Sequence, residues 1–201
     1  MKVTSFQVGI VGTNCYVAEN NKKECIIIDV AYSGVKVEEY IKENGLKPLA
    51  ILLTHGHFDH CGGARYIFKG EKLPVYCRKE DVELASSASK NRWGAPSLDC
   101  DVTNVIEEDD TFSIGSFDIK VLHTPGHTPG SACYFIENYM FSGDTLFAQD
   151  VGRTDLAGGS MIELKKSLQK IKAIEGDFTL LPGHEESSTL SYEKQNNRYF
   201  K

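Results

Sequence analysis

A short apolar run that ends in a cluster of histidines is the feature that most restricts the fold of this chain. The run at residues 49–53, Leu-Ala-Ile-Leu-Leu, predicts a buried strand. His55, His57, Asp59 and His60 follow it within a few residues. In extended backbone, residues two positions apart point the same way, so His55 and His57 can bind one metal ion together. Asp59 and His60 lie further along the turn, where they can face a second ion.

Four ligands from one loop cannot complete two metal coordination spheres, so other segments have to contribute. His127, Asp144 and His184 each follow a predicted strand and come directly after a glycine, which lets the backbone turn sharply beside an ion. We therefore expect separate loops to bring all these side chains to one edge of the fold. For His123, the remaining histidine, we expect a structural role rather than a substrate or supporting role.

Apolar runs between turn signals predict strands in both halves of the chain, at residues 5–9, 15–18, 25–30, 49–54, 75–77, 117–122, 132–136, 139–141 and 178–181. Helical patterns alternate with them. Ser160 and Glu163 predict the start of a helix with an apolar face, and Gly45 predicts the end of another. Shorter helices are expected at 79–85, at 190–200 and from His60 onward. Residues 86–110 lack a regular pattern, and we expect a solvated surface loop there.

Composition and length limit the class of protein further. A chain of 201 residues fits one domain over residues 1–201, and its net charge of −6 argues against nucleic acid as a partner. The six cysteines form no CxxC pair and are expected to be reduced thiols. No basic N-terminal segment precedes an apolar stretch, and no apolar run is long enough for a bilayer. We expect a cytoplasmic protein with no membrane partner.

The order of the motifs resembles that of the metallo-β-lactamase superfamily. H-x-H-x-D-H at residues 55–60 is followed by Gly-His, Gly-Asp and a second Gly-His. The segments THGHFDHCGG, HTPGHTPGS, FSGDTLF and LPGHEESSTLSYEKQNNRYF look especially like the short glyoxalase II-like (hydroxyacylglutathione hydrolase-like) members, in order along nearly the whole chain. This resemblance implies an α+β fold, a four-layer αβ/βα sandwich in which helices flank two mixed β-sheets.

The resemblance also implies a ligand set for two divalent metal ions, with zinc favoured and iron or manganese as alternatives. It implies that the first ion is bound by His55, His57 and His127, that the second is bound by Asp59, His60 and His184, and that Asp144 bridges the two. It further matches Asp29 to an acid that orients a ligand histidine, although Val30-Ala31 stands where the family usually has Pro-Gly.

The activity implied is hydrolysis of a small thioester or ester by a hydroxide held between the metals, with Asp59 handling a proton. Two departures leave glutathione open as the thiol carrier. The chain ends about one helix after His184, and Gly152-Arg153-Thr154-Asp155 replaces the Lys- and Tyr-bearing loop of full glyoxalase II enzymes. Arg153 is therefore a candidate to hold a substrate carboxylate, and an ion pair with Asp150 or Asp155 is the alternative.

Other activities share parts of this motif pattern. A persulfide dioxygenase-like oxidoreductase with a single iron is the main alternative, since such relatives carry a similar Gly-Arg-Thr-Asp loop, but they usually lose the second metal site. Phosphodiester cleavage, as in RNA-processing nucleases, is disfavoured by the acidic balance. Hydrolysis of β-lactams is disfavoured because Asp144 stands where the commonest zinc lactamases have a cysteine.

Overall fold

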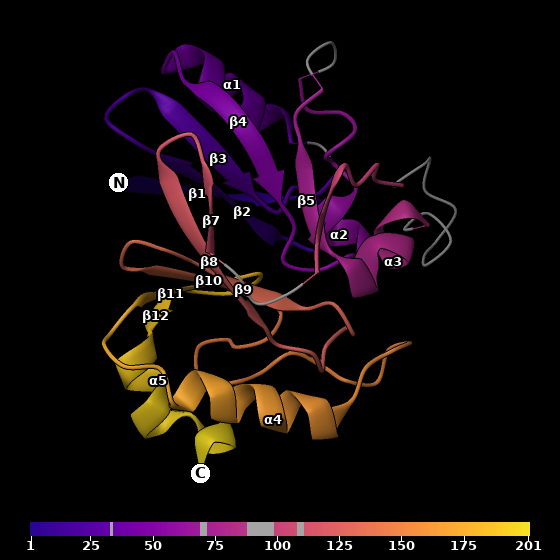
Figure 1. The fold of residues 1–201 in the computed structure, drawn as a ribbon, viewed down its shortest axis with the longest axis vertical. Coiled ribbons are helices and arrows are strands. Elements are labelled where there is room, and N and C mark those ends of the chain that lie inside the picture. The colour runs from indigo at the N-terminus through magenta and orange to yellow at the C-terminus, as the bar shows by residue number, and fades with distance from the viewer. Residues whose placement is uncertain (33, 69–71, 88–98, 108–110) are drawn as a thin grey trace.

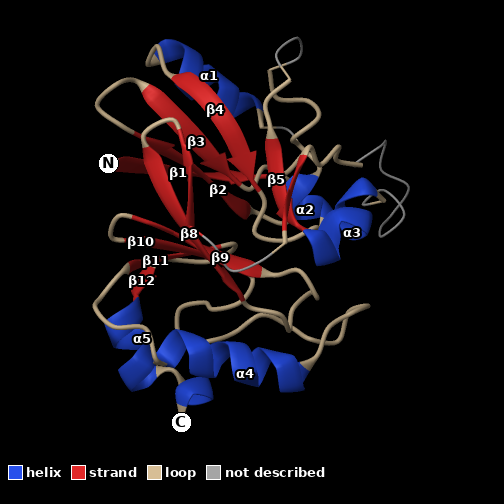
Figure 2. Cartoon of the chain, in the orientation of Figure 1, coloured by secondary structure: helices blue, strands red, loops and turns tan. Residues whose placement is uncertain are grey.

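Two six-stranded β-sheets pack face to face, with helices on their outer sides (Figures 1 and 2). The computed structural model describes residues 1–32, 34–68, 72–87, 99–107 and 111–201. The two sheets are mixed and the helices form the outer layers, so the predicted four-layer sandwich is confirmed. Within the described ranges, no helix is long and apolar enough to cross a membrane.

The first sheet comes from the N-terminal half and is antiparallel at one edge and parallel at the other. Its strands follow chain order: β1 (Lys2–Val8), β2 (Thr13–Glu19), β3 (Glu24–Ile28), β4 (Lys47–Leu52), β5 (Val75–Arg78) and β6 (Asn104–Ile106). The pairs β1–β2 and β2–β3 are antiparallel, and the remaining pairs are parallel. The carboxyl ends of β3, β4 and β5 therefore meet at one edge of the sheet, which is where ligand loops are expected.

The second sheet has the order β12-β11-β10-β9-β8-β7. Its strands are β7 (Thr111–Ile114), β8 (Phe117–His123), β9 (Ala132–Ile136), β10 (Tyr139–Gly143), β11 (Thr179–Pro182) and β12 (Ser188–Thr189). All its pairs are antiparallel except β10–β11, which is parallel because helix α4 (Met161–Lys172) lies between those two strands in the chain.

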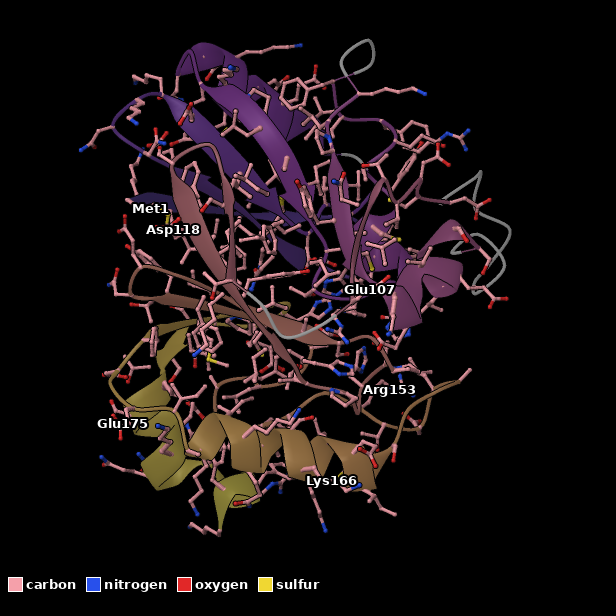
Figure 3. The ribbon with its side chains drawn as sticks, viewed as in Figure 1. Met1, Glu107, Asp118, Arg153, Lys166 and Glu175 are labelled. Carbon is pink, nitrogen blue, oxygen red and sulfur yellow. The ribbon has the colours of Figure 1, made fainter. Side chains whose placement is uncertain are left out.

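Alternate residues of the central strands point to different cores. On β3, Ile26 and Ile28 pack between the two sheets with Ile119 and Phe141, whereas Ile27 faces the outer core under α1 (Val35–Glu43). A third core lies between the second sheet and the helices α4 and α5 (Leu190–Asn196), which cover its outer face (Figure 1). Side chains fill the space between these layers (Figure 3).

The predicted helices are present, with shifted boundaries. Ser160 caps α4 by accepting the Glu163 N–H, and α1 ends before Gly45, which has a left-handed φ of +62°. Residues 79–85 form a 3-10 turn (Lys79–Asp81) followed by α3 (Val82–Ser86). At the C-terminus, α5 stops and a 3-10 turn (Arg198–Phe200) follows, because Asn197 adopts an extended conformation.

Two sequence predictions need correction. The helix expected from His60 onward is the single turn α2 (Phe58–Cys61), which begins before His60 and ends before the glycines. The loop expected at 86–110 contains strand β6, whose Cys77↔Val105 register pairs it with β5. Three residues are too few to show a strand pattern, and Val105 is half exposed at the sheet edge. The rest of that prediction at 88–98 and 108–110 lies outside the described residues.

Candidate metal centre

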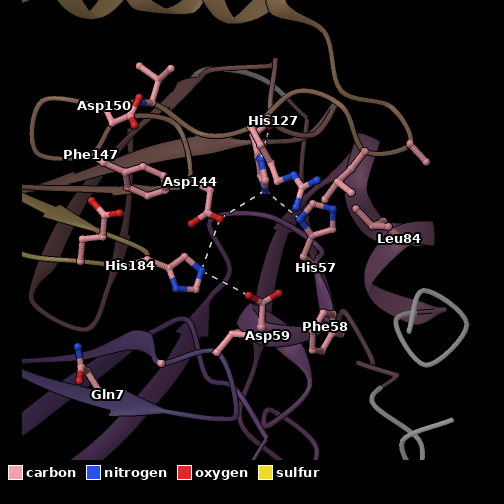
Figure 4. Close-up of a pocket in the computed structure, with 17 residues that line it drawn as sticks. Gln7, His57, Phe58, Asp59, Leu84, His127, Asp144, Phe147, Asp150 and His184 are labelled. Carbon is pink, nitrogen blue, oxygen red and sulfur yellow. Dashed lines mark hydrogen bonds and ion pairs between the residues drawn. The ribbon is translucent and has the colours of Figure 1, made fainter. Parts of the chain in front are cut away.

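The predicted metal ligands lie at the shared edge of the two sheets, on loops and in one helical turn. Figure 4 shows five of them, His57, Asp59, His127, Asp144 and His184. The loop after β4 and the turn α2 carry His55, His57, Asp59 and His60 from the first sheet. The second sheet supplies the other three, which are His127 between β8 and β9, Asp144 after β10 and His184 after β11. The side chains predicted as ligands therefore do converge in the folded chain.

Cross-sheet hydrogen bonds hold these loops in register. The Tyr134 hydroxyl of the second sheet donates to the Leu53 carbonyl over 2.8 Å, just before the histidine loop. The Ala132 N–H donates to the Thr54 carbonyl over 2.9 Å. In the other direction, the Tyr16 hydroxyl donates to the Pro182 carbonyl over 2.6 Å, two residues before His184. Two tyrosine hydroxyls and one backbone N–H thus fix the relative position of the ligand loops across the two sheets.

The potential donor atoms form three overlapping groups, each within 4.8 Å: His55/His57/His127, His55/His60/Asp144 and Asp59/His60/His184. His60 Nε2 lies 3.3 Å from His184 Nε2, and His184 Nε2 lies 3.4 Å from Asp59 Oδ2. Ligands of a tetrahedral ion with bonds of about 2.0–2.1 Å are separated by about 3.3–3.4 Å. The spacings within the Asp59/His60/His184 group therefore suit a metal ion.

Asp144 lies between the outer two groups. Its Oδ2 is 3.5 Å from His127 Nε2 and 3.6 Å from His184 Nε2, and its Oδ1 is 3.4 Å from His60 Nε2. One carboxylate therefore reaches imidazoles of both groups, which is the position a bridging ligand needs.

Two buried atoms of this cluster lack a hydrogen-bond partner. They are His55 Nε2 and Asp144 Oδ1, out of four such side-chain atoms among the residues that the structure describes. An unpaired buried polar atom costs about 1–3 kcal/mol, so each requires an explanation. A bound cation accepts both lone pairs and removes the cost, so the donor set fits a metal.

Hydrogen bonds on the far side of the rings turn the Nε2 atoms toward the centre. His127 Nδ1 lies 2.7 Å from the Arg153 carbonyl, and His60 Nδ1 lies 2.8 Å from Asp29 Oδ2. A carbonyl or carboxylate only accepts, so both Nδ1 atoms carry the proton. Nε2 then becomes the donor to a metal when its lone pair is free. Asp29 thus lies beside a ligand histidine, as the resemblance implied. Its backbone is in a left-handed conformation with φ +51°.

Burial and charge divide the histidines into two electrostatic types. Burial, assisted by neighbouring imidazoles, lowers the pKa of His55 and lowers that of His57 to about 4, so both are neutral at neutral pH. Burial opposes the charged form of His60, but Asp144, Asp29 and Asp59 outweigh it and raise its pKa to about 10. Without a cation the imidazole of His60 is therefore charged at neutral pH and carries a second proton, on Nε2. A metal ion that binds at Nε2 replaces this proton.

A cavity of about 890 Å³ opens onto the cluster. Five of its lining residues are predicted ligands: His57, Asp59, His127, Asp144 and His184. The other lining residues in the described ranges are mainly apolar, including Val11, Phe58, Leu84, Phe147, Val151, Leu156 and Ala157, with Gln7, Asp150, Arg153 and Glu185 as polar groups. The cavity can hold a small molecule with its reacting bond against the cluster (Figure 4).

Arg153 lines this cavity but already has an acidic partner. Its guanidinium donates to both carboxylate oxygens of Asp155, over 2.6 and 2.7 Å, and both side chains are exposed. Arg153 therefore forms the ion pair with Asp155, which is one of the two pairs predicted as its alternative role. A substrate carboxylate would have to compete with Asp155 for the same donors.

His123 and Asp81 both contact the loops that carry the ligands. The structural role expected for His123 agrees with its contact, because its Nε2 lies 2.8 Å from the Pro129 carbonyl. Asp81 was not singled out from the sequence, although its buried carboxylate contacts two ligand loops. It stands in a short segment of ordinary helical composition, so no motif marks it.

The fold and the cluster together define a class of protein, namely sandwiches with an imidazole-rich metal centre at the edge of two sheets. The chain belongs to the metallo-beta-lactamase superfamily, whose family profile matches residues 8–184. Members of this fold bind divalent metal ions, and the family assignment agrees with the His/Asp cluster.

Curated relatives cover nearly the whole chain. The probable metallo-hydrolase YqgX of Bacillus subtilis is 37% identical, over 98% of this chain and 96% of its own length. The hydroxyacylglutathione hydrolase GloC of Haemophilus influenzae is 31% identical, over 98% and 94%. These similarities support a metal-dependent hydrolase.

Solved structures agree in fold and length. The BLEG-1 B3 metallo-beta-lactamase superposes with a TM-score of 0.93 at 32% identity, covering 100% of both chains. TTHA1623 in a di-iron-bound form superposes with a TM-score of 0.88 at 32% identity, covering 98% and 99%. One of these similar proteins is thus named a lactamase, and the other binds iron.

Proposed function

We propose that this chain hydrolyses a small thioester or ester with two divalent metal ions bound at the edge cluster. One ion is assigned to His55, His57 and His127, the other to Asp59, His60 and His184, with Asp144 shared. The convergence of these donors carries the proposal, and two of the buried donor atoms, His55 Nε2 and Asp144 Oδ1, make no hydrogen bond.

The pair of ions supplies a hydroxide nucleophile at neutral pH and a positive charge for the developing oxyanion. The chain's own residues arrange this chemistry. Asp59 lines the cavity, and His60 and His184 together with its own backbone N–H outweigh burial and lower the pKa of its carboxyl group, so it stays a charged ligand. We assign to it the handling of a proton beside the nucleophile. No serine, cysteine or threonine lines the described wall of the cavity, so the proposed step uses no side-chain nucleophile.

The substrate class follows from the cavity and from the relatives. Apolar side chains such as Phe58 and Leu84 line one side of the cluster, and Phe147 lines the other side together with polar Gln7 and Asp150 (Figure 4). One relative is named a hydroxyacylglutathione hydrolase, and an acyl group on the thiol of glutathione is a thioester, which favours this bond over other esters. We therefore propose an acyl thioester with an apolar portion.

A persulfide dioxygenase-like oxidoreductase with a single iron is the second candidate, because the Gly152-Arg153-Thr154-Asp155 loop resembles the loop of such enzymes. The complete second group, Asp59, His60 and His184, favours the hydrolase. Oxygen consumption with glutathione persulfide, measured beside thioester cleavage on iron-loaded protein, separates the two reactions.

The proposed function is tested by metal analysis of the purified protein, followed by assays on thioesters, lactones, a β-lactam and phosphodiesters. We expect about two metal equivalents and preferential thioester cleavage. His57→Ala should lose metal and reduce cleavage by more than about 100-fold, since loss of a mere supporting residue already costs about 10- to 100-fold. His123→Gln is the matched control, a histidine outside the cluster, and should retain both. A metal-free protein with His57→Ala fully active would refute the proposal.

A further inference from the structure

A single buried carboxylate joins two of the ligand loops. Asp81 lies at the end of the 3-10 turn before α3 and is 0% exposed. Its Oδ2 accepts the Gly56 N–H over 2.9 Å and the Thr128 hydroxyl over 2.7 Å. Its Oδ1 accepts the Gly130 N–H over 2.7 Å. Three short hydrogen bonds therefore converge on one side chain.

The donors belong to the loops that carry the three-histidine group. Gly56 stands between His55 and His57, and Thr128 directly follows His127. The Thr128 hydroxyl also lies 2.7 Å from Ser131 Oγ, which extends the network along the same loop. Asp81 touches none of the three histidines through these bonds. It fixes the backbone on which each of them is mounted.

Packing alone does not explain why a carboxylate is buried at this position. Asp81 is the N-cap residue of α3, where an aspartate ordinarily accepts an N–H of its own helix, yet it makes no such bond. Burial raises the pKa of its carboxyl group, and the hydrogen bonds from Thr128, Gly56 and Gly130 are the largest effects that oppose the rise. The carboxylate thus serves the ligand loops instead of its helix.

The close contacts of Gly56 and Gly130 with Asp81 also indicate that Asp81 serves the ligand loops. A Cβ on Gly56 would lie 2.7 Å from the Asp81 carbonyl oxygen, and a Cβ on Gly130 would lie 2.6 Å from the Asp81 carboxyl carbon. Neither glycine has a left-handed φ, so backbone conformation does not require glycine at these positions. Glycine is required at both positions because Asp81 approaches them closely.

We propose that Asp81 is the positioning residue for the metal site formed by His55, His57 and His127. The inference rests on the proposed metal centre. It makes Asp81 the counterpart of Asp29, whose carboxylate holds Thr54 and His60 on the other side of the same loop. Each half of the centre then has its own buried acid.

The test is Asp81→Asn, which keeps the shape but places an amide donor against groups that donate. Cobalt(II) titration of the metal-free protein, followed by absorption spectroscopy, measures the affinity and geometry of each site. His57→Ala and His184→Ala provide reference spectra for loss of one site or the other. We expect the affinity of one equivalent to fall about 10- to 100-fold with a spectrum like that of His57→Ala, while the other equivalent is retained.

Two further variants complete the design. Asp118→Asn is the matched control, since Asp118 is exposed and lies on the opposite side of the molecule from Arg153 (Figure 3). If Asp81→Asn fails to fold, Thr128→Val removes one donor and should show the same site-selective loss to a smaller degree. Equal weakening of both equivalents, or no weakening, overturns the inference. A wild-type protein that binds fewer than two equivalents instead refutes the proposed function.

Discussion

Adding one methyl group at Gly183 should disrupt the metal centre without removing any ligand. A Cβ at this position would lie 2.2 Å from Asp144 Oδ1 and 2.7 Å from His60 Cε1. The φ of Gly183 is not left-handed, so alanine meets no backbone strain there. The peptide cannot easily retreat, because its N–H donates to Gly143 over 2.9 Å and its carbonyl accepts from Asn14 over 2.7 Å.

The size of the effect follows from these distances. Asp144 Oδ1 would have to move by about 0.8 Å to reach a tight contact of 3.0 Å. Metal–ligand distances tolerate changes of about 0.2 Å, so the displacement is about four times too large. We expect Gly183→Ala to lose at least one metal equivalent and to reduce kcat/KM by about 100-fold or more.

The assay combines elemental analysis, thioester kinetics and circular dichroism of the metal-free variant. Gly176→Ala is the control, because no atom lies within 4 Å of its Cβ position. Its φ of +84° makes alanine strained, so it should lower the free energy of unfolding by about 1 kcal/mol with metal content unchanged. A Gly183→Ala protein with full metal content and unaltered kinetics would show that the reasoning about Asp144 is wrong.

Three further predictions concern the supporting structure. Asp29→Asn, which tolerates the same left-handed φ, should weaken metal binding about 10- to 100-fold through His60, measured by chelator competition. Ser160→Ala removes the α4 cap and should lower the free energy of unfolding by about 1 kcal/mol in urea denaturation, with unchanged metal content. Ile119→Ala, fully buried between the sheets, should cost about 2–5 kcal/mol, and a loss below 1 kcal/mol would contradict the assigned core.

Local sequence patterns were sufficient for the central elements and for the ligands. The strands β3, β4 and β9 are runs of apolar residues long enough to be recognised, and they hold the cores of the sandwich. The ligands follow such strands and stand beside glycines, so their positions could be predicted without tertiary contacts. Their convergence was expected because one loop cannot complete two coordination spheres, but the division of the ligands between two ions needed the resemblance to a family.

The features that were missed depend on contacts between distant residues. Strands β6 and β12 have three and two residues, and each is defined by its neighbour in the sheet rather than by its own composition. The partners of Asp81 lie 25, 47 and 49 residues away along the chain. A lone aspartate in a short helical segment gives no sign of such partners, so the structure was needed to find it.

The division of the ligands between the two sheets has a mechanical consequence. Residues 1–107 supply His55, His57, Asp59 and His60, and residues 111–201 supply His127, Asp144 and His184. Neither half of the sandwich can therefore complete either coordination sphere by itself. Each ion would act as a cross-link between the sheets, contributing about 2.7 kcal/mol against unfolding at a free concentration 100 times its dissociation constant. Opening of the sandwich and release of metal would then be one event, and a chelator would loosen the two halves together.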